Sequence, residues 1–125
     1  MGLDMYAYRT SVQLSKPVDF SDEIQSNCSE IQYWRKHPNL HGWMESLYRE
    51  KGGDGDFNCN PVELTSEDLD RLEEDIRNGG LPHTSGFFFG ESQGNDEETN
   101  EDLAFVEKAR QVIAEGDRVF YDSWW

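Results

Sequence analysis

The chain has 125 residues, of which 26 are acidic and 11 are basic, and its net charge of −15 is large for this length. A surface this acidic repels the phosphates of nucleic acids and of anionic membranes, so the composition argues against direct nucleic-acid binding and against membrane association. Aromatic residues make up 13% of the chain. Each removes roughly 150–250 Å² from water when buried, so one compact core is feasible. We therefore predict a single folded domain over residues 1–125.

The amino-terminal segment does not resemble a secretory signal. MGLDMYAYRT carries Asp4 and Arg9 within its first ten residues, where a signal needs an apolar run. No run approaches the roughly 18 apolar residues that a membrane helix requires. We expect a cytoplasmic protein whose Cys28 and Cys59 remain reduced thiols.

The first half of the chain predicts two strands and one helix. In LDMYAYRTSV, residues 3–12, the side chains Leu3, Met5 and Ala7 alternate with more polar ones, which is typical of a strand. Residues 11–29 have no clear period and predict a loop with at most one short element. Residues 30–35 favour an extended strand, because a residue before proline, here His37, avoids helical geometry. After Pro38 the apolar residues recur at helical spacing up to about Lys51, where KGGDGD ends the helix.

The second half predicts two further helices and two or three short strands. FNCNPVEL favours a short strand interrupted at Pro61, and hence either an edge strand or a bulge. A helix should begin at Thr65 or Ser66 and end at residues 78–80, where Asn-Gly-Gly permits a left-handed stop. GFFFG favours a buried strand, residues 91–102 a solvated loop, and Asn100 the cap of a third helix. RVFYDSWW alternates and closes the chain as a strand.

Together these elements predict an α+β domain. We expect a mostly antiparallel sheet of about four strands with about three helices packed on it, without repeats or linkers.

Three segments resemble a known group of proteins: MGLDMY at the start, YWRK with a following His-x-Trp pair, and SGFFFG before a chain that ends in FYDSWW. The chain is similar in these segments to small, functionally uncharacterised proteins of bacteriophages and prophages. Here His83 stands before Thr84 where the group often has LPT. The resemblance implies a phage accessory role in the cytoplasm of the bacterial host and names no activity.

Aromatic and cationic residues concentrate in EIQYWRKHPNLHGW, residues 30–43. An indole can stack on a flat ligand, a guanidinium can bind phosphate through two hydrogen bonds, and an ammonium adds a point charge. The candidate pocket for a nucleotide-like anion consists of Tyr33, Trp34, Arg35, Lys36, His41, Trp43 and Ser85. The alternative is that both tryptophans are core. In a strand, Tyr33 and Arg35 face away from Trp34 and Lys36.

Most of the negative charge lies in residues 61–115, which hold fifteen acidic and four basic residues. Rows of carboxylates on helices can imitate DNA phosphates or attract a basic host protein, for example as an anti-defence inhibitor. The alternative is a solvated face that keeps the protein soluble. The candidate partner-binding residues are Glu67, Asp70, Glu73, Glu74, Asp96, Glu97, Glu98 and Glu101.

Neither a metal site nor a catalytic motif is favoured, and we expect no cofactor. His37 and His41 are separated by Pro38, and single cysteines lack the paired spacing of zinc sites. A nucleophile-and-base arrangement would draw on His41, His83 and Ser85, but HTSGF lacks the G-x-S-x-G elbow. We therefore predict a non-catalytic accessory protein that binds a basic host protein. The competing hypothesis is a pocket protein that binds or cleaves a small ligand.

Overall fold

The structure is a computed structural model that describes residues 2–24, 27–84, 92 and 94–125. Its elements in chain order are β1 Asp4–Thr10, α1 Ser21–Ile24, β2 Ser29–Arg35, α2 Pro38–Glu50, β3 Val62–Leu64, α3 Ser66–Arg77, α4 Asp96–Ala114 and β4 Arg118–Trp124. The four strands form one antiparallel sheet in the order β2-β1-β4-β3. The predicted single-domain α+β fold is confirmed, and the extra helix is the single turn α1.

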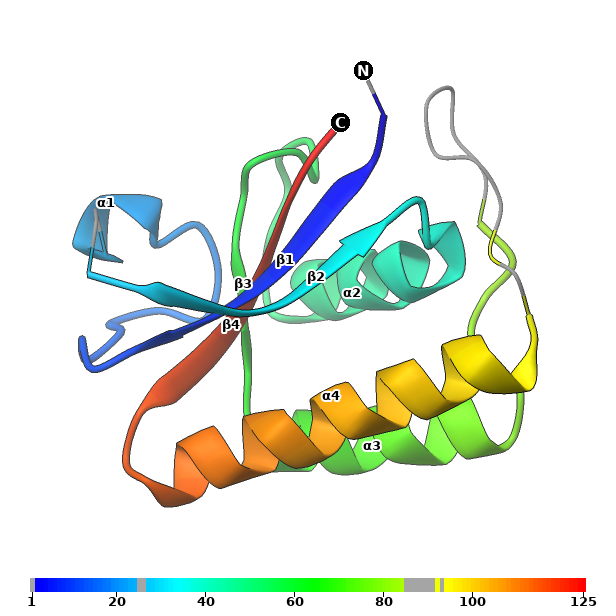
Figure 1. The fold of residues 1–125 in the computed structure, drawn as a ribbon. Coiled ribbons are helices and arrows are strands. Elements are labelled where there is room, and N and C mark those ends of the chain that lie inside the picture. The colour runs from blue at the N-terminus through cyan, green and yellow to red at the C-terminus, as the bar shows by residue number, and fades with distance from the viewer. Residues whose placement is uncertain (1, 25–26, 85–91, 93) are drawn as a thin grey trace.

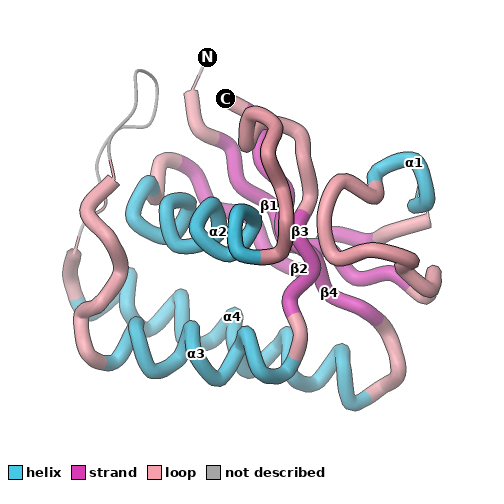
Figure 2. Tube along the Cα trace, turned by 180° about the vertical axis from the view of Figure 1, so that it is seen from behind, coloured by secondary structure: helices cyan, strands magenta, loops and turns pink. Residues whose placement is uncertain are grey.

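The helices lie on the two faces of the sheet very unequally (Figures 1 and 2). α2, α3 and α4 cover one face, where Met5, Ala7 and Tyr121 of the strands belong to the main core together with apolar residues of all three helices. On the other face α1 covers one end only, through a small cluster of Phe20, Ile24 and Phe120. The rest of that second face carries no helix in the part of the chain that the structure describes.

α2 and α3 have the boundaries that the sequence predicts. Pro38 opens α2, and its apolar stripe is buried. The chain leaves α2 through Gly52, whose φ of 105° suits glycine. Thr65 caps α3 and forms a capping box with Asp68. Gly79 ends it with a φ of 66°.

The prediction for α4 is wrong at its start. The helix begins at Asp96 with Asn95 as its cap, and the Asn95 side chain accepts a hydrogen bond from the Glu98 backbone N–H at 2.8 Å. Asn100, the predicted cap, lies inside the helix, and residues 96–102 are helical instead of looped. The first turn has no apolar stripe to reveal it, yet its three acidic residues suit the positive end of the helix dipole.

The edge position predicted for FNCNPVEL is confirmed, but β3 comprises only residues 62–64, after Pro61, and the residues before the proline are not strand. The strand predicted for GFFFG lies outside the described residues. Among the helices that the structure describes, none has the length and apolar character needed to span a bilayer.

Candidate functional site

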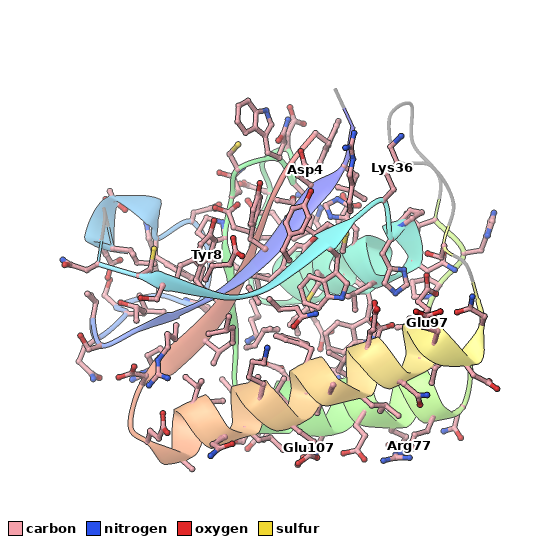
Figure 3. The ribbon with its side chains drawn as sticks, in the orientation of Figure 1. Asp4, Tyr8, Lys36, Arg77, Glu97 and Glu107 are labelled. Atoms are coloured by element: carbon pink, nitrogen blue, oxygen red, sulfur yellow. The ribbon has the colours of Figure 1, made fainter. Side chains whose placement is uncertain are left out.

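A pocket of about 310 Å³ lies where the end of β2 faces the start of α4. Its lining combines the predicted YWRK segment with part of the predicted acidic surface: Tyr33, Trp34, Arg35, Lys36, His37, Glu97, Glu98 and Glu101. The two candidate regions, about 60 residues apart in the sequence, therefore meet in one place. Lys36 at the end of β2 and Glu97 in the first turn of α4 mark the two sides in Figure 3, where the Lys36 side chain extends away from α4.

Backbone strain positions the cationic side of this pocket. Lys36 has a φ of 56°, a left-handed conformation that side chains other than glycine rarely adopt. Its backbone N–H donates to the Leu3 carbonyl at 2.9 Å, which fixes the turn between β2 and Pro38. The Lys36 ammonium forms no ion pair with the described residues, and Arg35 is 4.0 Å from Asp4. Both cations thus remain at the exposed rim.

Trp34 forms the floor of the pocket as a core residue. Only 5% of its surface is exposed, and its ring meets Phe105 of α4 edge-on, with centroids 4.8 Å apart. Its face is therefore not available for a ligand to stack on. The buried indole N–H has no hydrogen-bond partner among the described residues.

His37 joins the starts of α2 and α4 through a buried hydrogen-bond chain. Its Nε2 lies 2.8 Å from Asp102, and its Nδ1 lies 2.7 Å from the Ser92 hydroxyl and 3.6 Å from Glu98. Ser92 also accepts the Asn39 backbone N–H at 3.0 Å, so it caps α2 from another segment. One oxygen of Asp102 is buried without a partner in the described chain.

This Ser-His-Asp order resembles a catalytic relay, but its surroundings favour a structural role. His37 is 4% exposed and Asp102 is 2% exposed. The Ser92 oxygen is already engaged by a backbone N–H, and Ser92 is not part of the pocket lining. A nucleophile must face the space that its substrate occupies. We therefore assign a structural role to these hydrogen bonds, which hold α2 against α4. Sequence reasoning weighed His37 only as a metal ligand and missed Ser92 and Asp102 as its partners, because they lie 55 and 65 positions away and no local motif marks them.

The other residues predicted for the pocket lie elsewhere. His41 is buried, contacts the Tyr121 hydroxyl at 2.7 Å, and burial lowers its pKa to about 4. Trp43 is 7% exposed, and its indole N–H donates to Asp75 at 2.7 Å. Both are core residues, and neither lines the pocket. Ser85 lies outside the described residues, and His83 is exposed on the loop after α3.

The eight predicted partner-binding carboxylates divide into three groups. Asp70 and Glu73 bind Arg110 at 2.7 and 2.5 Å across the boundary between α3 and α4. These hydrogen bonds raise the pKa of Arg110, while those from Arg77 and Arg110 lower the pKa of Glu73. Glu98 accepts the Gly94 backbone N–H at 3.1 Å. The remaining five are exposed and form no ion pair with the described cations: Glu67, Glu74, Asp96, Glu97 and Glu101.

A larger hollow of about 470 Å³ lies between the start of α3 and the turn from α4 to β4. Three of its charged residues are already paired: Glu63 and Arg118 with each other at 2.7 Å, and Asp117 with Arg9 at 2.9 Å. The smaller pocket beside YWRK keeps more of its charge available to a ligand. Within the described residues, no group of three or more histidine, cysteine or acidic side chains is arranged to hold a metal ion.

Comparison with protein-family models, with curated proteins and with solved structures gave no match.

Proposed function

We propose that the protein is a non-catalytic accessory protein that binds a basic partner protein through carboxylates on the exposed sides of α3 and α4. The observation that supports this is the group of five exposed carboxylates without a cation in the described chain. α3 and α4 lie side by side (Figure 1), and the five carboxylates are exposed residues of these two helices. Like-charge repulsion among them is relieved when a cationic surface approaches.

The phage origin and a host protein as partner follow from the motif resemblance alone. A nucleic-acid-binding channel of a host defence protein has the required positive charge, and carboxylate rows can occupy it in place of phosphates. Charge complementarity of this kind acts mainly on the association rate and on the choice of partner.

The test is a fourfold reversal of Glu67, Glu74, Asp96 and Glu97 to lysine, which changes the net charge from −15 to −7. A matched control reverses four exposed acidic residues outside these helices, Asp22, Glu30, Asp54 and Asp56, and reaches the same net charge. Core histones serve as a basic protein of known charge, and circular dichroism checks that each variant folds. We expect the association rate to fall roughly tenfold or more in the first variant and much less in the control. Equal losses in both variants would show that net charge alone is responsible.

The pocket beside YWRK supports a second candidate, a small-ligand binding protein. Three glutamates share its lining with Arg35 and Lys36. Because these glutamates repel phosphate, a zwitterion of amino-acid or dipeptide size fits better than the nucleotide-like anion predicted from the sequence. Thermal shift with dipeptides and with nucleotides tests it: a ligand present at 100 times its Kd adds about 2.7 kcal/mol. Glu101→Gln should reduce a dipeptide shift, and a shift with nucleotides alone would reverse the choice of ligand.

A further inference from the structure

The sheet face opposite α2, α3 and α4 carries aromatic and acidic side chains in ordered rows. Pairing of β1 with β2 and β4 places three residues side by side in each row. The rows are Arg35–Asp4–Trp124, then Tyr33–Tyr6–Asp122, then Glu30–Tyr8–Phe120. Asp4 and Tyr8 mark the two ends of this face in Figure 3.

One end of this face is covered and the other is open. At the Tyr8 end, Phe20 and Phe120 meet edge-on with centroids 5.4 Å apart, beneath α1. At the Asp4 end, Tyr33 is 44% exposed, Trp124 is 68% exposed and Trp125 is 37% exposed. These three are the exposed large apolar side chains of the described chain, and all lie around Asp4. A cluster of exposed aromatic residues marks an interaction site more often than scattered ones do.

The open end forms a hollow of about 300 Å³ lined by Gly2, Asp4, Trp124 and Trp125. Its walls are held in place before any partner arrives. Trp125 donates its indole N–H to the Phe57 carbonyl at 2.7 Å and its backbone N–H to Asn58 at 3.1 Å. Asp4 accepts the Tyr33 hydroxyl at 2.6 Å. The Trp124 indole has no hydrogen bond within the described residues.

The charge of this end is negative. Asp4 has one weak cationic contact, Arg35 at 4.0 Å, and the Arg35 side chain is 58% exposed. Asp122 lies in the next row and pairs with no cation among the described residues. The pKa of the neighbouring Tyr6 is raised, mainly by burial and secondly by the negative charge of Asp4. An aromatic surface beside a carboxylate attracts a guanidinium by cation–π contact and by a charge-assisted hydrogen bond.

We propose that the hollow at Asp4, Trp124 and Trp125 binds an arginine side chain of the basic partner. The guanidinium stacks on the exposed indole of Trp124 and donates to the carboxylate of Asp4. A planar guanidinium fits this pairing better than the ammonium of lysine. The inference rests on the proposed function for the basic character of the partner, and it adds a specific anchor on a face that α3 and α4 do not form.

The experiment uses a six-residue peptide with two arginines as the probe, and the same peptide with lysine or glutamate in place of arginine. Proton–nitrogen NMR of the full chain resolves the indole N–H groups of its four tryptophans. We expect the signals of Trp124 and Trp125 to shift on titration, and those of the buried Trp34 and Trp43 to stay. The arginine peptide should bind roughly threefold more tightly than the lysine peptide.

Variants separate this site from long-range attraction. Trp124→Leu, at an exposed position, and Asp4→Asn should each raise the Kd of the arginine peptide roughly fivefold. Asp22→Asn removes the same charge at an exposed position outside this hollow and outside α3 and α4, and should raise it less than about twofold. Equal effects of Asp4→Asn and Asp22→Asn, or no effect of Trp124→Leu, would overturn the site. The fourfold lysine variant of α3 and α4 should keep the Trp124 shift. If that variant also kept full binding of the basic protein, the proposed function would fail while this site stood.

Discussion

At the residue scale, Asp102 holds the pocket together without lining it. Its carboxylate lies 2.8 Å from His37 inside the protein, so removing it leaves the imidazole N–H buried without an acceptor. We expect Asp102→Ala to lower the free energy of unfolding by about 1–3 kcal/mol. Asp102→Asn keeps an acceptor and should cost less. Urea unfolding measures both.

The neighbouring residue supplies the control for this prediction. Glu101 is exposed and has no cationic partner in the described chain, so Glu101→Ala should stay within about 0.5 kcal/mol of the wild type. If Asp102→Ala lowered the free energy of unfolding no more than Glu101→Ala does, the buried hydrogen bonds that link Asp102, His37 and Ser92 would not stabilise the fold.

The buried carboxyl of Asp122 predicts a loss of stability as the pH rises. Burial raises its pKa from the ordinary value of 3.8 to about 6, so the folded state binds this proton more tightly than the unfolded state. The contribution of Asp122 to stability therefore decreases as pH rises through that interval. Because asparagine stays neutral, Asp122→Asn should raise the melting temperature at pH 7.5, and the gain should vanish below the ordinary pKa. A constant difference across a pH series would contradict this.

The YWRK segment shows what the sequence can and cannot predict about single residues. Strand alternation correctly placed Trp34 on the opposite face from Tyr33, since that follows from backbone geometry. The sequence did not reveal which of the two faces is core. The predicted pocket also included His41, which is buried elsewhere, whereas His37 lines the pocket. That choice depends on how α4 packs beside β2, a contact between residues far apart in the chain.

At the scale of elements, apolar periodicity located β1, α2, α3 and β4, because each packs one regularly spaced row of apolar side chains into the main core. It did not locate α1, a single turn inside the segment 11–29 where the sequence allowed one short element, and it misplaced the start of α4. There the chain is acidic on all sides, so only the cap distinguishes helix from loop. Asn95 and Asn100 are both suitable cap residues, and the local sequence favoured Asn100, which lies inside the helix.

The two asparagines make a paired test of where α4 begins. Asn95→Ala removes the side chain that accepts the Glu98 N–H, and we expect a loss of about 1 kcal/mol in stability. Asn100→Ala places a better helix former inside the helix and should raise stability by roughly 0.5 kcal/mol. Thermal unfolding of both variants is sufficient. If Asn100→Ala lost stability and Asn95→Ala did not, the helix would begin at Asn100, as predicted from the sequence.

At the scale of the whole molecule, the net charge of −15 conceals two kinds of carboxylate. Asp70 and Glu73 are bound by Arg110, which joins α3 to α4, whereas Glu74 and Glu101 are exposed without a cation in the described chain. The sequence showed the excess of acid but not this division, because Arg110 reaches 37 and 40 residues back along the chain. Only the unpaired group is available to a basic partner.

The division predicts opposite effects from two variants of equal charge. Glu74→Gln with Glu101→Gln, and Asp70→Asn with Glu73→Gln, each change the net charge from −15 to −13. The first pair removes repulsion only, so the melting temperature in low salt should rise by about 2 °C. The second pair takes two partners from Arg110, so the melting temperature should fall.

Salt screens repulsion between exposed charges, with a Debye length of about 10 Å at 0.1 M, so the gain of the first pair should shrink as salt is added. Calorimetry at a series of salt concentrations measures both variants beside the wild type. Equal shifts in the two variants would mean that only the total charge matters, and the five unpaired carboxylates would lose their distinction as a binding surface.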